Sequence, residues 1–237
     1  MQVLEISPFE RLTFLGKTRS GKTVAARHLL LLAALMWERK KDSRSQIFIL
    51  ATKEPKPPDF GARYFPGTTF AAVRGIHNVL KPATRIVIVY PTRAEKMDGG
   101  ASYEWFYDVL LNRAAAGRKA IVYTDEMVNV TEGRANGGPP SFRYLYQQGG
   151  GLFLGAWAGQ QDAAYIERVA LSQAEHYIVF PLRMPQDRAK MGGIMGMREL
   201  PERFPDKRGF WYSGPGEIRY YSDIATATGV AVVGVRR

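Results

Sequence analysis

The chain has 237 residues, of which 46% are apolar and 23% are charged, and these proportions exclude an intrinsically disordered or collagen-like protein. It contains no cysteine, which excludes disulfide bonds, cysteine-bound zinc and a thiol nucleophile, and which favours an intracellular compartment. Lysine and arginine number 33 against 22 acidic residues, and the net charge of +11 indicates a polyanionic partner, with nucleic acid as the first candidate.

Short β-branched and aromatic runs alternate with longer helical stretches, a pattern typical of βαβ units around a parallel sheet. We expect one α/β domain over residues 1–237, with its core at about 11–222 and a short C-terminal tail at 223–237. In chain order we predict a strand at 11–16, a helix at 22–41, a strand at 46–52, a Pro-rich loop at 54–66, a short helix at 70–80, a strand at 85–90, a helix at 103–116, strands at 119–124 and 152–158, a helix at 163–174, a strand at 177–182 and a β-hairpin at 208–221.

The longest apolar run, at residues 29–37, is much shorter than the roughly 20 apolar residues that a membrane-spanning helix needs. We therefore expect no transmembrane segment and interpret this run as the core-facing part of the first helix.

The sharpest motif follows the first predicted strand, where the sequence GKTRSGKT matches G-x-x-x-x-G-K-[ST], the Walker A pattern or P-loop. Its glycines let backbone N–H groups turn toward phosphates, and the helix N-terminus adds a positive dipole. Lys22 is expected to reach the β- and γ-phosphates, and Thr23 to hold Mg²⁺. The motif thus predicts ATP and Mg²⁺ as cofactors, with the nucleotide bound by Gly16, Lys17, Thr18, Arg19, Ser20, Gly21, Lys22 and Thr23.

Two adjacent carboxylates end the fourth predicted strand in the sequence IVYTDE, which looks like a Walker B motif. Open α/β sheets place their ligands at the carboxyl ends of parallel strands. We therefore expect Asp125 to bind the magnesium ion and Glu126 to act as the general base that polarises the attacking water.

An amide follows the next predicted strand, in the sequence AGQQ. Gln160 is placed to touch the γ-phosphate or the attacking water, and it is included among the predicted catalytic residues with Lys22 and Glu126. Gln161 is the alternative for the same role.

The order of these motifs resembles the FtsK–HerA superfamily of P-loop translocases, and within it the genome-packaging ATPases of membrane-containing icosahedral viruses. The resemblance covers about residues 12–221. In addition to GKTRSGKT, IVYTDE and AGQQ, it depends on a C-terminal order in which the strand YIVFPL precedes DR at 187–188, GG at 192–193 and a hairpin with GPG at 214–216. The short chain also fits the packaging members, because cellular members usually carry extra domains.

The resemblance implies a fold class and a function. The fold would be α/β, a three-layer P-loop NTPase of the ASCE, RecA-like type with a mostly parallel central sheet and a C-terminal β-hairpin. The function would be that of a homo-oligomeric ring, a pentamer or hexamer, which hydrolyses ATP to translocate double-stranded DNA regardless of its sequence and packages a viral genome. A capsid or capsid-membrane protein is a further implied partner, and the implied location is the host cytoplasm or the virion.

Ring ATPases commonly complete each site with an arginine from the neighbouring subunit. The resemblance points to Arg188 for this role. DNA contacts are expected from two loops facing a central pore, at residues 131–143 and 53–63. Besides Arg188, the candidates for the arginine supplied by the neighbouring subunit are Arg183, Arg143, Arg134 and Arg168.

Two other functional classes stay open. Lys17 lies where the ParA–MinD partition ATPases carry a signature lysine, so a dimeric DNA-binding switch is one alternative, although those proteins lack a glutamate at the position of Glu126. A small P-loop kinase is the other, for which the sequence has no clear lid. The charge alone also fits an acidic protein partner, a nucleotide substrate or simple solubility, and the motifs do not distinguish ATP from other nucleoside triphosphates.

Overall fold

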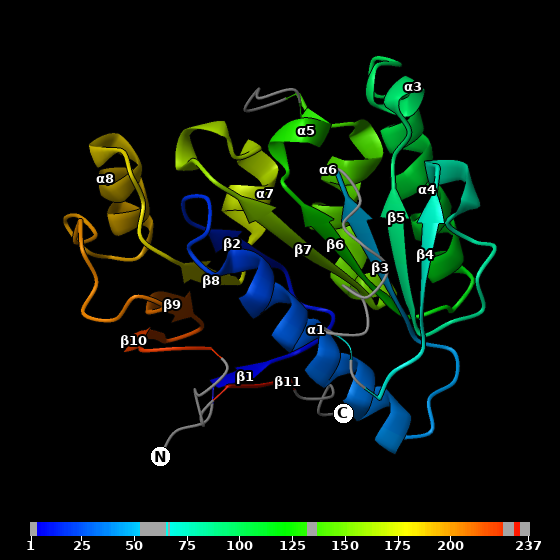
Figure 1. Ribbon diagram of the computed structural model, residues 1–237, viewed down its shortest axis with the longest axis horizontal. Helices are drawn as coiled ribbons and strands as arrows, with labels where there is room; N and C mark the ends of the chain where they lie inside the picture. Colours follow the sequence, from blue (N-terminus) through cyan, green and yellow to red (C-terminus); the bar gives the residue numbers. More distant parts are fainter. Residues whose placement is uncertain (1–3, 53–64, 66, 132–136, 225–229, 233–237) are drawn as a thin grey trace.

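The computed structural model describes residues 4–52, 65, 67–131, 137–224 and 230–232 (Figure 1). Strands in this part of the chain are β1 (Leu4–Ile6), β2 (Leu12–Leu15), β3 (Gln46–Ala51), β4 (Phe70–Arg74), β5 (Ile86–Tyr90), β6 (Ala120–Asp125), β7 (Leu154–Gln160), β8 (His176–Val179), β9 (Phe210–Gly214), β10 (Glu217–Tyr221) and β11 (Val230–Val232). The α-helices are α1 (Lys22–Arg39), α3 (Arg93–Lys96), α4 (Ala101–Ala115), α5 (Val128–Thr131), α6 (Pro140–Gln148), α7 (Arg168–Gln173) and α8 (Pro185–Ile194). Short 3₁₀ turns lie at Ile76–Asn78, Gly149–Leu152 and Ala163–Tyr165.

Most of these strands belong to one sheet, which in the described residues has nine strands in the order β10-β9-β8-β2-β7-β6-β3-β5-β4. Every neighbouring pair from β8 to β4 is parallel, whereas β9 is antiparallel to both β8 and β10. The structure confirms the expected α/β architecture with a mostly parallel sheet and a C-terminal hairpin. The strand that carries the P-loop, β2, lies inside the sheet between β7 and β8.

Helices cover both faces of the sheet, with α1 in front and α4 behind in Figure 1. Alternate residues of each central strand face opposite layers. In β3, Ile47 and Ile49 pack in the core under α1, whereas Phe48 and Leu50 pack in the core formed with α4, α6 and α7. Burial on both faces explains the near-continuous apolar strands of the sequence. Each such large side chain stabilises the fold by about 1.5–3 kcal/mol.

The helix predicted at residues 70–80 is wrong. Phe70–Arg74 forms the edge strand β4, which pairs in parallel with β5, and a 3₁₀ turn follows. Ala71 and Ala72 have high helix propensity, but pairing with Val87 and Ile88 decides the conformation at this edge. Gly75, with φ 90°, then turns the chain out of the strand.

The stretch predicted as one helix at residues 163–174 is interrupted. A 3₁₀ turn over Ala163–Tyr165 is followed by α7, which begins only at Arg168. Glu167 has an extended backbone, and its carboxylate accepts a hydrogen bond of 2.6 Å from the N–H of Val169, so it caps the later helix.

Several elements have no counterpart in the sequence prediction, among them a helix near the C-terminal hairpin and a small second sheet. The helix α8 begins at Pro185, which suits a first helical position because proline lacks an N–H that would otherwise be unpaired there. The small second sheet is parallel, and in it Leu4–Ile6 pairs with Val230–Val232, two segments from opposite ends of the chain. Three-residue strands that pair over such a separation leave no local signal.

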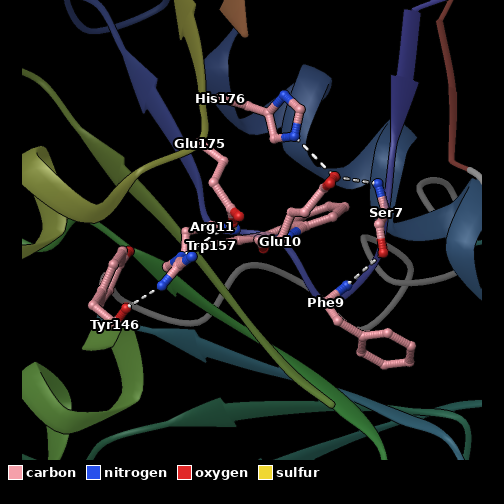
Figure 2. Close-up of polar contacts among 8 residues, drawn as sticks. All are labelled: Ser7, Phe9, Glu10, Arg11, Tyr146, Trp157, Glu175 and His176. Carbon is pink, nitrogen blue, oxygen red and sulfur yellow. Dashed lines mark hydrogen bonds and ion pairs between the residues drawn. The ribbon is translucent and has the colours of Figure 1, made fainter. Parts of the chain in front are cut away.

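A polar cluster fixes the segment before β2 to the amino end of β8 (Figure 2). The Nε2 atom of His176 lies 2.8 Å from Oε2 of Glu10, and its Nδ1 lies 2.7 Å from the hydroxyl of Tyr212. Partial burial by itself would raise the pKa of Glu10, but hydrogen bonds from His176 and from the N–H of Ser7 hold this pKa below its usual value. The cluster therefore stabilises the end of the sheet that lies opposite the P-loop.

Among the described residues, no helix combines the length and the apolar character that crossing a membrane requires. The proposed DNA loop at residues 53–63 and the candidate Arg134 lie outside the described residues.

Candidate active site

The P-loop joins the end of β2 to the start of α1 and is held by strands on both sides. The N–H of Gly16 donates to the carbonyl of Gln160 on β7, and the N–H of Lys17 donates to the carbonyl of Pro181 after β8, both at 3.2 Å. A Cβ at Gly16 would lie 2.6 Å from Cβ of Phe180, so only glycine fits at this position. The loop is thus fixed by its neighbours before any ligand binds.

The side chains of the loop suit the phosphates of a nucleotide. The ammonium of Lys22 is buried and donates to the loop's own carbonyls, to Gly16 at 2.5 Å and to Lys17 at 3.4 Å. The hydroxyl of Ser20 is buried and has no hydrogen-bond partner among the described residues. Thr23 follows Lys22 in the first turn of α1, whose first turn contains no acidic residue. A buried cation, an unused donor and a helix N-terminus converge here, and together they fit an anionic triphosphate.

The predicted metal ligand Asp125 ends β6 at the same edge of the sheet. The residue is 9% exposed, and its carboxylate accepts a hydrogen bond of 3.2 Å from the hydroxyl of Tyr123. Burial, and secondarily the charge of Asp125, raises the pKa of Tyr123 well above its usual value. The phenol therefore stays neutral and donates to the carboxylate. A second contact, from the hydroxyl of Thr52 to the carbonyl of Asp125 at 2.7 Å, fixes the backbone.

The predicted base, Glu126, is 4% exposed and has a left-handed backbone with φ 69°. The neighbouring strand holds the turn that follows it, because the N–H of Met127 donates to the carbonyl of Gly159 at 2.8 Å. This backbone turns the chain away from β6 directly after Asp125, so the two adjacent carboxylates do not continue the alternation of the strand.

The two glutamines after the predicted fifth strand have different positions. Gln160 is the last residue of β7, is 1% exposed, and accepts a hydrogen bond of 2.9 Å from the N–H of Val128 through its side-chain oxygen. Gln161 is the first residue beyond the strand. Its amide nitrogen donates to Oε2 of Glu126 at 2.9 Å, and its oxygen accepts from the hydroxyl of Thr18 at 2.6 Å.

Gln161 therefore connects the P-loop to the predicted base, whereas Gln160 supports the turn after Glu126. The role of Gln160 as a sensor of the γ-phosphate stays a prediction, and the geometry favours Gln161, the alternative, for direct contact with the catalytic groups.

The predicted trans arginine, Arg188, is buried in its own chain. Its Nε donates to Oε1 of Glu199 at 3.0 Å, and its Nη1 donates to the carbonyl of Arg183 at 3.3 Å. Arg183 itself is exposed and follows Pro181, the residue that binds the P-loop backbone, by two positions. Arg143 donates to the carbonyl of Gly138 at 3.2 Å. The assignment of Arg188 stays a prediction, which requires it to leave Glu199.

No protein-family model matches the chain, and no curated protein sequence matches it. Its fold is nevertheless similar to solved structures. The genome packaging NTPase B204 from Sulfolobus turreted icosahedral virus 2, in complex with ATP-gammaS, superimposes with a TM-score of 0.67 at 14% identity over 92% of this chain and 99% of that one.

The DNA-packaging ATPase B204 from Sulfolobus turreted icosahedral virus gives a TM-score of 0.65 at 15% identity, again over 92% of this chain and 99% of that one. VirB4 of Thermoanaerobacter pseudethanolicus gives 0.62 at 10% identity over 92% of each chain. At these identities the likeness shows a shared fold, and it extends over nearly the whole length of each protein. It confirms the fold that the motif order implied.

Proposed function

We propose that this chain is an ATPase that assembles as a homo-oligomeric ring, a pentamer or hexamer, and translocates double-stranded DNA to package a viral genome into a capsid. The observation that carries the proposal is the convergence of the P-loop, Asp125 and Glu126 at one sheet edge, with Gln161 joining the loop to Glu126. Support also comes from the net charge of +11 and from the fold shared with two viral packaging NTPases.

Each residue of the site has a chemical role in this proposal. Lys22 leaves the loop carbonyls and binds the β- and γ-phosphates, assisted by the N-terminal dipole of α1. Thr23 and Asp125 hold Mg²⁺, which when bound neutralises phosphate charge. Glu126 accepts the proton of the attacking water, and Gln161 orients its carboxylate.

Two alternatives are distinguished by assembly. A partition-type switch would form a dimer that depends on nucleotide, and a small P-loop kinase would be a monomer. Glu126 at the strand end favours water as the acceptor of the phosphoryl group, because a hydrolase needs a base there. The mass of the particle with and without nucleotide separates the three, and the ring proposal requires a pentamer or hexamer.

The proposal places the working complex in the host cytoplasm or in the virion, with a capsid or capsid-membrane protein as a further partner. DNA would contact loops that face a central pore. Of the predicted loop at residues 131–143, the described part is Thr131 and residues 137–143, which includes Arg143. Phosphate contacts of this kind carry no sequence information.

Double-stranded DNA is expected to raise the ATPase rate and to bind with little dependence on its sequence. Because binding would come from phosphate neutralisation, the affinity should fall steeply between about 50 and about 200 mM salt, by about 10³–10⁵ if six to ten phosphates are contacted. Binding isotherms over a salt series, and ATPase rates with long duplexes of unrelated sequence, measure both. A strong preference for one short sequence, or an affinity that does not change with salt concentration, would contradict the translocase proposal.

Replacing Gln161 with alanine should lower kcat for ATP by about 10–100-fold with little change in nucleotide affinity, because Glu126 loses the group that orients it. Gln160→Ala is the matched control. It removes the buried contact to Val128, and if Gln160 only supports the turn it should mainly lower the melting temperature, whereas a sensor of the γ-phosphate would also lose turnover. Parent-like turnover in Gln161→Ala would contradict the positioning role, and ATPase assays with nucleotide titrations decide it.

A further inference from the structure

A second concave feature lies at the opposite edge of the sheet from the P-loop, where α1 ends and β3 and β5 begin. It is a cavity with a volume of about 400 Å³. Five basic side chains and one acidic one line it, and we call it the basic cavity: Arg44, Lys81, Arg85, Arg113, Arg118 and Glu38. Nothing in the nucleotide site explains this concentration of positive charge.

Two of the arginines are held in place by neutral oxygen atoms. Arg85 donates through Nη1 to the carbonyl of Ser45 at 2.6 Å and also to that of Asp42. Arg113 donates through Nη2 to the side-chain oxygen of Gln46 at 2.5 Å, and Gln46 in turn is fixed by a bond to the chain before β5. These contacts orient the guanidinium groups but leave their charges uncompensated.

Among the described residues, none of the five basic side chains forms an ion pair. Partial burial, and then the neighbouring charge of Arg118, lowers the pKa of Arg113. The cavity of about 360 Å³ beside the cluster in Figure 2 differs, because there Arg11 is paired with Glu175 at 3.1 Å. Five basic side chains gathered around one carboxylate, Glu38, leave an excess of like charges that repel one another, and a bound anion would relieve that repulsion.

The basic cavity also has an apolar surface. Leu80 is 39% exposed within it, beside the half-buried Pro82. The guanidinium carbon of Arg113 lies 5.8 Å from the ring centre of Phe48, so the cation covers an apolar floor. An apolar floor with a charged rim is the usual anatomy of a protein-binding hot spot.

We propose that the basic cavity binds an acidic segment of a partner protein, in which carboxylate side chains flank an apolar one. The fixed guanidinium forks of Arg85 and Arg113 match carboxylates, and Leu80 offers the contact for the apolar side chain. A DNA duplex fits less well, because it has no apolar side chain to place on Leu80 and its backbone does not enter a small concavity. The site is independent of the nucleotide site and does not rest on the proposed function.

The probe for this site is a fluorescein-labelled peptide of repeated Glu-Glu-Leu triplets, compared with the same peptide in which serine replaces leucine. Fluorescence anisotropy should show that the full chain binds the leucine peptide more tightly. Lys81→Gln combined with Arg118→Gln should weaken this binding about tenfold or more. Both side chains are exposed and make no hydrogen bond to any part of the chain that the structure describes, so the fold should tolerate the change.

The matched control is Arg198→Gln combined with Lys207→Gln, which removes the same two charges from the segment between α8 and β9. This control should leave peptide binding within twofold of the parent. Leu80→Ser should weaken binding of the leucine peptide but not binding of the serine peptide. Equal loss in the control, equal binding of the serine peptide, or no peptide binding would overturn the proposal. The proposal would also be overturned if Lys81→Gln combined with Arg118→Gln weakened binding of duplex DNA alone, which would identify a nucleic-acid site.

Discussion

Replacing Glu126 with glutamine is expected to lower ATP turnover by about 10²–10⁴-fold while nucleotide affinity stays within a few-fold of the parent. In the parent, the amide nitrogen of Gln161 lies 2.9 Å from the carboxylate of Glu126. Glutamine has nearly the same shape as glutamate and keeps an oxygen that can accept this hydrogen bond. It cannot take a proton from water. The substitution thus removes the base without removing the geometry that surrounds it.

Single-turnover hydrolysis, with nucleotide affinity measured separately, tests this expectation. Lys22→Ala is the contrasting variant, because it removes the cation for the phosphates and should abolish binding itself. If Glu126→Gln hydrolysed ATP at nearly the parent rate, Glu126 would not be the base. If it bound no nucleotide, its role would be structural.

The second large effect concerns the arginine expected to act on the neighbouring subunit's nucleotide. If Arg188 has this role, Arg188→Ala should cut turnover by about 10³–10⁵ and leave nucleotide affinity nearly intact. The structure supplies a matched control, because Arg188 is paired with Glu199 at 3.0 Å. Glu199→Ala breaks the same ion pair but keeps the arginine. A purely structural Arg188 would make the two variants equally slow, whereas a trans arginine would leave Glu199→Ala active.

Mixed rings decide whether the arginine acts between subunits. Subunits with Arg188→Ala, combined with subunits with Glu126→Gln, should recover part of the activity, because some interfaces then pair an intact Glu126 with an intact Arg188. No recovery in rings shown to be mixed would remove Arg188 from the mechanism. Arg183 would then be tested in the same way, since it is exposed and lies two residues after the P-loop contact at Pro181.

The sequence predicts well those functional groups that lie next to one another along the chain. The P-loop and the Asp125–Glu126 pair each occupy a single run of residues, and each lies where a buried strand ends. Their place at the carboxyl edge of the sheet then follows from the parallel topology, which the structure confirms. The chemistry assigned to these residues stays a prediction.

The prediction failed mainly at the ends of helices and strands and at contacts between segments that are far apart in the sequence. The fifth strand was expected to end at residue 158 but continues to Gln160, so Gln160 belongs to the sheet and Gln161 is the first side chain free to approach Glu126. The edge strand Phe70–Arg74 has the composition of a helix, and only its partner β5 makes it a strand. No local pattern could have indicated the contact between Arg188 and Glu199, because α8 itself was not expected.

The left-handed backbone at Glu126, with φ 69°, lowers the stability of the fold at the residue that we propose as the base. A residue with a side chain in such a conformation costs of order 1–3 kcal/mol at a strained site, whereas glycine adopts it with little cost. Glycine at position 126 would relieve this backbone strain, and it would also remove the carboxylate that we propose as the base. If Glu126 is the base, selection of variants for a high melting temperature alone would therefore favour loss of activity at this position.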